Sequence, residues 1–349
     1  MEFGFYLPCY WRDASYPMDR MYSDMVEQAC LAERLGFKTV WIPEHHFINL
    51  LVHPNPLLTG VRVAAATRTI RIGTSVLVLP FFDMRRLAGE LAQADHLMGG
   101  RLELGVGRGA FKYEFDRYGV KVEDSRDIFD ESLALLERLL SESDVSSDTD
   151  AYRFPPLTIT PRPLQRPLPP VWIAAVTPDA IYHTARRGYH VMTTPLRASF
   201  EDAKRQAESY HRGRSESANP ASAQRLGMLR MAYVARDRAD IQEKLEFAAQ
   251  NDRCHHNVRT TDGAVTLGMI QGTESGRSMS EIEDALIIGS AEQCLEKVAA
   301  YAQLGIDEFI VNMGFGASHA DVMCSLETFA DKVMPHFTAA GKREHANSL

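Results

Sequence analysis

The sequence predicts an α/β protein built as a single closed (β/α)8 barrel, the TIM-barrel architecture with insertions, and two patterns carry this prediction. Short apolar, β-rich runs alternate with amphipathic helical stretches, which favours a parallel sheet covered by helices. Counting the runs gives about eight strands, and eight such units favour closure into a barrel. An open, doubly wound sheet is the alternative, but no Gly-x-Gly-x-x-Gly segment follows the first strand, which weakens it.

The expected elements follow one another in regular order. The helix at 19–35 places Met21, Met25 and Ala29 on one apolar stripe. Strands are expected at 3–8, 38–42, 70–79, 101–106, 171–175, 190–194, 225–235 and 308–313. Further helices are expected at 55–67, 84–98, 126–141 and 319–334. One barrel domain is expected to span 1–340, ahead of a frayed tail at 341–349.

Glycine marks the joints between helices and the strands that follow them. Gly36, Gly99, Gly188 and Gly305 each lie where a helical pattern stops and an apolar run begins. Glycine takes the left-handed conformation that ends a helix without steric cost. The segments AERLGFKTVWI and YAQLGIDEFIV, near opposite ends of the chain, repeat this order: both have Leu-Gly at the joint and apolar residues at the same positions after it. The repetition indicates one fold that begins and ends with the same kind of unit.

Two segments do not fit the β/α repeat. Residues 142–169 are polar and then rich in proline, so helix is excluded and a short hairpin or surface excursion is expected. Residues 251–284 are polar and weakly periodic. Such a long irregular stretch is either a functional lid or disordered.

Composition excludes several classes of function. The net charge is −8 and no Lys/Arg cluster resembles a nucleic-acid footprint. No apolar run approaches the ~20 residues of a membrane span, and no signal peptide is apparent. The five cysteines form no Cys-x-x-Cys pair and are expected to be reduced. A cytoplasmic protein without nucleic-acid or membrane partners is therefore expected.

The first candidates for catalysis follow the second predicted strand. In a β/α barrel the reactive groups lie beyond the carboxyl ends of the strands, where Glu44, His45 and His46 occur. A histidine can act as a general base near neutral pH, and an adjacent carboxylate can fix its tautomer. Structural histidines in a polar loop are an equally good interpretation. No metal site is expected, because neighbouring residues on an extended segment point in opposite directions.

Two further strand ends offer places for an anionic group. Arg108, next to Gly107, lies in a glycine-flanked turn, where the backbone can approach a ligand and arginine can grip phosphate or carboxylate. A solvated loop arginine is the alternative. Thr177 and Pro178 begin a helix whose free N–H groups could bind phosphate, a signal that every capped helix shares. Asp179 would repel that phosphate unless it points away.

Aromatic residues gather near the predicted strand ends. They could form the walls around a planar cofactor and an apolar substrate, although ordinary core packing explains any one of them equally well. These residues are Tyr10, Trp11, Phe47, Phe81, Phe82 and Phe111. Of these, Tyr10, Phe47, Phe81 and Phe111 are the candidates for a substrate pocket.

Five segments together resemble the luciferase-like monooxygenases, in style closest to the branch that contains the bacterial luciferase alpha subunit. These are WIPEHHF, IRIGTSVLVLP, ADHLMGGRLELGVGRG, VWIAAVTPDAIYHTARRG and LGIDEFIVNMGFG. The resemblance runs from the first strand to the last helix. It implies a barrel that uses reduced FMN and O2, through a C4a-peroxyflavin, to oxygenate a small organic substrate. It also implies a separate NAD(P)H:flavin reductase that supplies FMNH2, and a homodimer.

The resemblance also assigns roles to individual residues. His45 corresponds to the catalytic histidine of the family, with Glu44 in support. Arg108 corresponds to the arginine that binds the FMN phosphate. Val176 and Thr177 fall where backbone amides and a hydroxyl complete that phosphate site.

Behind the flavin ring, Ser75 and Val76 fall where luciferase has a non-proline cis peptide. The stretch 251–284 resembles the family's mobile active-site loop, which excludes water. Two positions depart from luciferase: Val176 replaces an acidic residue, and Gly107 replaces a reactive cysteine near the flavin. Light emission and a long-chain aldehyde substrate are therefore not implied.

Two other functions are compatible with the same barrel. One is an F420-dependent hydride-transfer enzyme, although the Glu-His-His-Phe segment favours FMN and oxygen. The other is a non-catalytic flavin-binding subunit, and the presence of both His45 and Arg108 argues against it.

Overall fold

A computed structural model describes residues 1–195, 199–217 and 223–337. Eight parallel strands pair in sequence order, and the last pairs with the first, so that the sheet closes into a barrel. The strands are β1 (Glu2–Tyr6), β2 (Thr39–Ile42), β3 (Arg71–Thr74), β5 (Leu102–Gly107), β8 (Val171–Ala174), β9 (His190–Thr193), β10 (Leu226–Val234) and β14 (Glu308–Asn312). The predicted fold class is confirmed.

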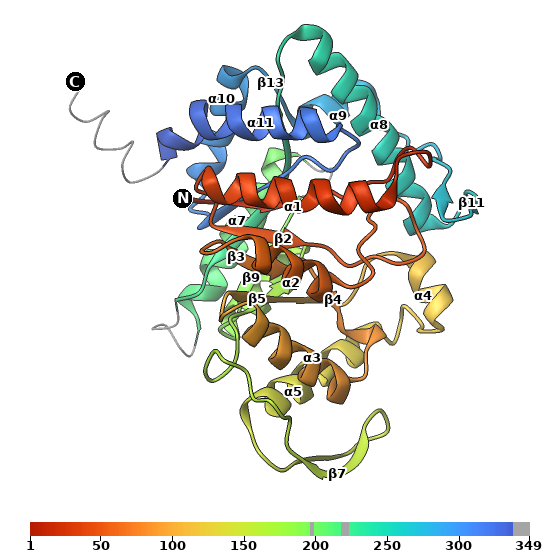
Figure 1. Cartoon of the computed structure of the whole chain (residues 1–349), viewed down its shortest axis with the longest axis vertical. Helices are drawn as coiled ribbons and strands as arrows, with labels where there is room; N and C mark the ends of the chain where they lie inside the picture. The colour runs from red at the N-terminus through yellow and green to blue at the C-terminus, as the bar shows by residue number, and fades with distance from the viewer. Residues whose placement is uncertain (196–198, 218–222, 338–349) are drawn as a thin grey trace, which may run out of the picture.

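The helices cover the outside of the barrel (Figure 1). Those of the first half are α1 (Met18–Arg34), α2 (Pro56–Ala66), α3 (Met84–Leu97), α4 (Lys112–Tyr118) and α5 (Ser125–Ser141). Those of the second half are α6 (Pro178–Arg186), α7 (Phe200–Ser215), α8 (Arg238–Thr260), α9 (Met279–Ala285), α10 (Ala291–Ala302) and α11 (His319–Lys332). Helices α1 and α11 lie side by side, so the first and last α-helices of the described residues meet on one face. Within the described residues, no helix combines the length and apolar character that a bilayer span requires.

Two tryptophans fill the barrel interior. Trp41 on β2 and Trp172 on β8 are fully buried, and their rings meet edge to face with centroids 5.2 Å apart. Their strands are not neighbours, so this contact crosses the barrel. Each indole N–H donates to a buried carboxylate: Trp41 to Glu308 at 2.9 Å, and Trp172 to Glu103 at 2.7 Å. The interior is therefore a packed core with satisfied polar groups and not a channel.

The third predicted strand is not continuous. The expected strand at 70–79 is divided into β3 and the short β4 (Leu77–Val78), which a 3-10 turn, Leu79–Phe81, follows. The peptide bond between Ser75 and Val76, between the two pieces, is cis. An apolar, β-branched run hides this break, because side-chain character does not report the rotation of a single peptide bond.

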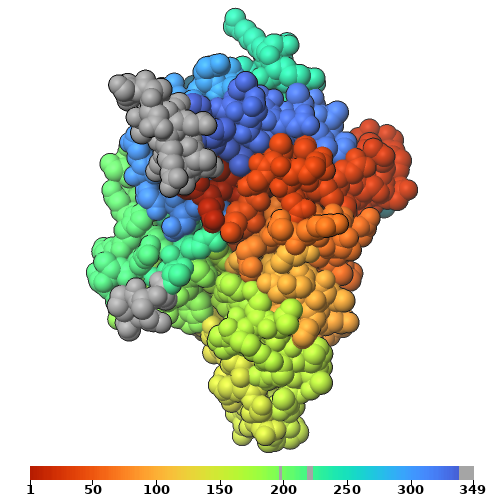
Figure 2. Space-filling view, turned by 60° about the vertical axis from the view of Figure 1, so that its left-hand side comes forward, coloured from red at the N-terminus to blue at the C-terminus, as the bar shows by residue number. Residues whose placement is uncertain are grey.

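The segment 142–169 contains an antiparallel hairpin of β6 (Val145–Asp148) and β7 (Arg153–Leu157). In Figure 2 this yellow-green part of the chain projects from the body of the molecule. The short strand β13 (Ile287–Gly289) pairs with β10 beyond the barrel. The expected tail at 341–349 lies outside the described residues.

The segment 251–284 is more regular than expected. Residues 251–260 form the last turns of α8, and a small hairpin of β11 (Val265–Thr266) and β12 (Met269–Ile270) precedes α9. The polar side chains of this segment led to the expectation of an irregular stretch, but some of them are buried and hydrogen-bonded. The Asn257 side chain donates to the Gln271 carbonyl at 2.7 Å and accepts from the Gly263 N–H at 2.9 Å.

Candidate active site

His45 is held from two sides just beyond the end of β2. Its Nδ1 lies 3.0 Å from Oε1 of Glu114, a buried residue of α4, and its ring stacks on Phe111 with centroids 4.2 Å apart. The same carboxylate oxygen accepts the backbone N–H of His46 at 2.7 Å. A carboxylate partner favours the tautomer with the hydrogen on Nδ1, which leaves the lone pair on Nε2. That nitrogen makes no hydrogen bond to any described residue, so it is available as a base.

Glu44 lies against the other histidine. Its Oε1 is 2.7 Å from Nε2 of His46, and its second oxygen accepts the Val78 N–H at 3.0 Å. Burial raises the pKa of the Glu44 carboxyl, and the contact with His46 opposes that rise. The resemblance puts Glu44 in support of His45, but the carboxylate in contact with His45 is that of Glu114. Nothing in the sequence marked Glu114, because only the packing of α4 over the strand ends brings it there.

The predicted pocket aromatics separate into three places. Phe47 and Phe81 pack around Tyr118, with ring centroids 5.4 and 4.4 Å from it, and enclose His46. Phe111 lies on His45. Tyr10 lies elsewhere, with its hydroxyl 3.9 Å from the Cys254 sulfur.

The cis peptide at Ser75 and Val76 borders the same strand-end surface. The Ser75 hydroxyl donates to the Met192 sulfur at 2.9 Å, which ties this turn to β9. Across from it, a Cβ at Gly107 would lie 2.5 Å from Cγ2 of Val76. Glycine is therefore the residue that fits there, and it keeps the backbone open toward the strand ends.

Arg108 and Thr177 follow the neighbouring strands β5 and β8. Arg108 is exposed, and its guanidinium contacts no described residue by hydrogen bond or ion pair. Thr177 caps α6 by accepting the Ala180 N–H at 3.3 Å, so its own hydroxyl hydrogen is free to donate. The Asp179 side chain is 86% exposed and lies 3.4 Å from His183, so it points away from the N-terminus of α6, where a phosphate could bind. The side chain of Val176, which precedes Thr177, is exposed, and its backbone carbonyl accepts a hydrogen bond from the Gln206 side chain.

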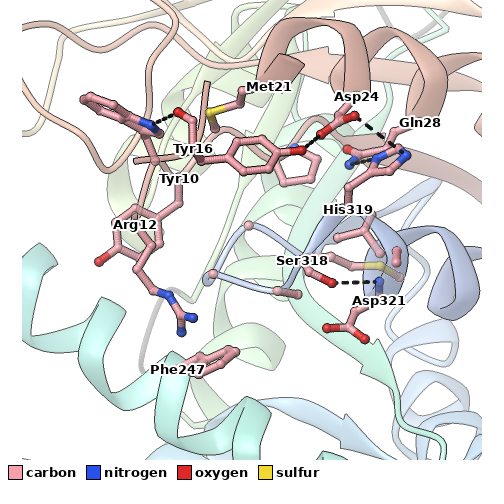
Figure 3. A pocket seen from close by; sticks show the side chains of 18 of the residues that line it. Tyr10, Arg12, Tyr16, Met21, Asp24, Gln28, Phe247, Ser318, His319 and Asp321 are labelled. Atoms are coloured by element: carbon pink, nitrogen blue, oxygen red, sulfur yellow. Dashed lines mark hydrogen bonds and ion pairs between the residues drawn. The ribbon is translucent and has the colours of Figure 1, made fainter. Parts of the chain in front are cut away.

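A cavity of about 540 Å³ opens at the ends of β1 and β14 (Figure 3). Tyr10, Tyr16, Gln28 and Phe247 are among its lining residues, and the Arg12 guanidinium lies 3.7 Å from the centre of the Phe247 ring. Of the predicted pocket residues only Tyr10 borders it. The cavity is thus separate from the surroundings of His45.

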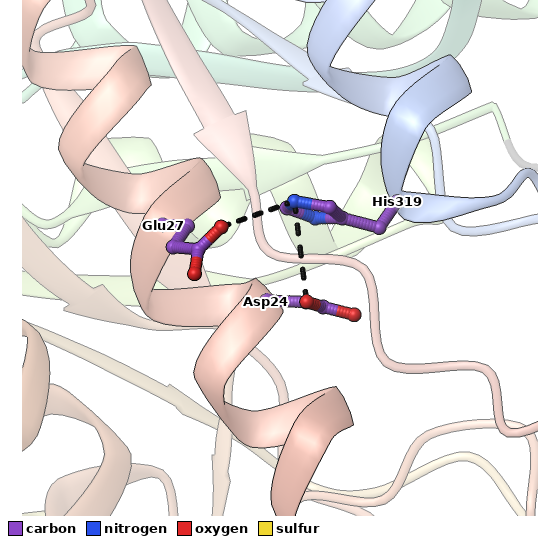
Figure 4. A group of neighbouring side chains, drawn as sticks. All are labelled: Asp24, Glu27 and His319. Carbon is purple, nitrogen blue, oxygen red and sulfur yellow. Dashed lines mark ion pairs between the residues drawn. The ribbon is translucent and has the colours of Figure 1, made fainter. Parts of the chain in front are cut away.

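At the edge of this cavity, His319 on α11 meets two carboxylates of α1 (Figure 4). Its Nε2 lies 3.3 Å from Glu27 and 3.9 Å from Asp24. Asp24 also forms an ion pair with Arg20 at 2.9 Å and accepts a hydrogen bond from the hydroxyl of Tyr16. The group is an ion-pair network that joins α1 to α11, and its three side chains have the spacing that could also hold a cation.

Residues 1–308 match the family model described as luciferase-like monooxygenase. The chain belongs to this family. The oxygenase component of a flavin-dependent trigonelline monooxygenase from Acinetobacter baylyi is 29% identical, over 94% of this chain and 93% of its own length. The match ends at the first residue of β14, so the rest of that strand and α11 lie beyond it.

Several solved structures share the fold. The monooxygenase RslO1 from Streptomyces bottropensis has 25% identity and a TM-score of 0.81, covering 97% of this chain and 100% of that one. A type II Baeyer-Villiger monooxygenase from Pseudomonas putida, in complex with FMN, has a TM-score of 0.77 at 16% identity, covering 97% and 99%. An F420-dependent secondary alcohol dehydrogenase has a TM-score of 0.74 at 18% identity, also covering 97% of this chain and 99% of that one. The fold therefore serves proteins of both cofactor types.

Proposed function

We propose that this luciferase-like protein is the oxygenase component of a two-component monooxygenase, which uses reduced FMN and O2 to oxygenate a small organic substrate. A separate NAD(P)H:flavin reductase would supply the reduced FMN. The relative from Acinetobacter baylyi, named as an oxygenase component, supports the division into two components. The observation that carries the proposal is the contact between His45 and Glu114, which prepares a base at the strand ends.

The residues at the strand ends fit a flavin with a phosphate tail. Arg108 offers an unpaired guanidinium, and Thr177 offers a hydroxyl beside the N-terminus of α6. A phosphate there would meet two donors and a favourable helix dipole. The bare backbone at Gly107, opposite Val76, leaves room for a flat ring system. Arg108, Thr177, Val176, Gly107, Ser75 and Val76 are therefore proposed to hold the cofactor.

Reduced FMN, when bound, supplies two electrons, with which O2 delivers one oxygen atom to the substrate and the other to water. His45 Nε2 is proposed to accept or return the proton that this exchange requires. Glu114 holds Nδ1, so that the ring keeps its orientation and a positive charge on it is stabilised. Phe111 covers one face of the His45 ring and limits the access of water.

Glu44 has a different proposed task. Its carboxylate binds both His46 and the backbone of β4, so it fixes the loop that carries His45. Glu44 is then a positioning residue. Phe47 and Phe81, with Tyr118, form the apolar wall beside this loop.

Anaerobic titration of the chain with reduced FMN and, in parallel, reduced F420 tests the choice of cofactor. We expect reduced FMN to bind more tightly, and the addition of O2 and a candidate substrate to the FMN complex to yield an oxygenated product. Preferential binding of reduced F420 would identify the hydride-transfer alternative. Binding of FMN without an oxygenated product, in the presence of reductase and candidate substrates, would identify a non-catalytic subunit.

A further inference from the structure

We propose that Arg259 binds a carboxylate of the organic substrate at the mouth of the His45 site, so that this enzyme acts on an anionic substrate. The proposal rests on the proposed function. It assigns to α8 a specificity-determining residue that contacts the substrate and leaves the flavin to Arg108.

The position of Arg259 follows from helical spacing along α8. Asp252, His255 and Arg259 are separated by three and four residues, so they share one face of the helix. The His255 ring packs against Phe111 with centroids 5.6 Å apart, and Phe111 stacks on His45. Helix α8 also packs on α4, which carries Glu114. This face of α8 is therefore turned toward the His45 site, and Arg259 lies one turn beyond His255.

The charge of Arg259 has no direct partner. The side chain is partly buried, its Nε is fully buried without a hydrogen-bond partner, and the guanidinium makes no ion pair with any described residue. Burial lowers its pKa, and the more distant charge of Asp252 opposes that change. The Asp252 carboxylate is itself engaged by Arg277 at 3.1 Å. A partly buried cation without a partner is costly unless a ligand of opposite charge completes it.

Two other partly buried arginines are satisfied within the protein. Arg101 donates to four backbone carbonyls and one threonine, and Arg225 reaches both Glu308 and Glu2. Arg259 differs from them in this respect. Its last-turn position on α8 favours a positive charge, but the guanidinium makes no hydrogen bond to the helix carbonyls. The planar fork of arginine matches a carboxylate, which would bind beside the contact between His255 and Phe111.

Two matched pairs of probes test this proposal: benzoate against benzamide, and octanoate against octanamide. Each is titrated calorimetrically into the FMN-loaded chain. We expect the carboxylate of at least one pair to bind roughly 10- to 100-fold more tightly than its amide. Arg259→Gln should abolish that preference, and Arg259→Lys should restore part of it. Arg253→Gln is the control, because Arg253 is exposed on the same helix and bonded to Gln250.

Three outcomes would overturn the proposal. The first is equal affinity for acid and amide in both pairs, while FMN binds normally. The second is an unchanged preference in Arg259→Gln. The third is a loss of affinity for FMN but not for riboflavin in Arg259→Gln, which would make the flavin phosphate the anion. Failure of the unaltered chain to bind reduced FMN under anaerobic conditions would instead contradict the proposed function. A normal melting temperature of the Gln and Lys variants shows that each has folded.

Discussion

Oε1 of Glu114 lies 3.0 Å from Nδ1 of His45, although 69 residues separate them along the chain. Glu114 is 1% exposed, and it receives the backbone N–H of His46 as well. A buried carboxylate at this distance fixes both the orientation and the tautomer of the ring. In the proposed mechanism, this contact prepares His45 as a base before any ligand binds.

Glu114→Gln should make His45 a less effective base, because glutamine can keep a hydrogen bond to Nδ1 but carries no negative charge. We expect the rate of product formation, or of FMNH2-dependent peroxide release in the absence of substrate, to change by roughly 10- to 100-fold. Steady-state kinetics of the purified variants measure this effect. Glu123→Gln, which changes an exposed surface carboxylate, should leave the rate unchanged.

Arg108→Gln should reduce the affinity for FMN but not for riboflavin, which lacks the phosphate. A charge-assisted contact with phosphate predicts a loss of roughly 10- to 100-fold. Equilibrium titration by flavin fluorescence distinguishes the two ligands. Arg62→Gln, another exposed arginine, serves as the control. An equal loss for FMN and riboflavin would contradict a phosphate seat at Arg108.

Gly107→Ala should damage both packing and cofactor binding. The added Cβ would lie 2.5 Å from Cγ2 of Val76, so the turn must shift. We expect the free energy of unfolding to fall by about 1–3 kcal/mol, with weaker FMN binding. Gly89→Ala, in α3, meets nothing within 4 Å and should stabilise the chain by about 0.5–1 kcal/mol. Denaturant titration of both variants provides the comparison.

Asn49→Ala should loosen the β11–β12 hairpin over the strand ends. The Asn49 side chain accepts the Ile270 N–H at 3.0 Å and donates to the Trp11 carbonyl at 2.9 Å, so it joins three loops. Loss of both bonds should reduce the free energy of local opening by roughly 1–3 kcal/mol. Amide hydrogen exchange should then accelerate at Ile270, while the barrel strands keep their protection. Unchanged exchange at Ile270 would show that the hairpin does not depend on Asn49.

Glu308 should make the barrel less stable as the pH rises. Burial raises the pKa of its carboxyl from 4.5 to about 7, and Arg225 opposes that rise. Between these values the folded chain keeps a proton that the unfolded chain has lost, so the free energy of unfolding falls as the pH increases. The shift corresponds to roughly 3 kcal/mol. Glu308→Gln should remove this contribution, so its stability relative to the unaltered chain should increase from pH 5 to pH 8.

The barrel could be predicted from the sequence because its signals are local. Gly36 and Gly305 end helices in the left-handed conformation, and the apolar runs after them become β2 and β14. Only the family resemblance predicted the cis peptide at Ser75 and Val76, because the residues there have the pattern of one continuous strand. The helical and hairpin parts of 251–284 were not predicted, because a polar residue such as Asn257 suggests a surface position although its side chain is buried and hydrogen-bonded.

The candidate site was predictable only in part, for a related reason. Position after a strand selected His45 and Arg108 correctly as strand-end residues. The partners of these residues depend on how α4 and α8 pack over the barrel, which no local pattern reports. Glu114 and Arg259 therefore emerged only from the three-dimensional arrangement.

Rapid mixing of the chain–FMNH2 complex with oxygenated buffer tests the central claim most directly, with His45→Ala and the exposed His183→Ala in parallel. Absorbance reports the disappearance of reduced FMN and the later appearance of oxidised FMN. We expect a delay between these events in the unaltered chain and in His183→Ala, and a delay at least about 10-fold shorter in His45→Ala. Oxidation without delay, at the rate of free FMNH2 in all three proteins, would contradict it.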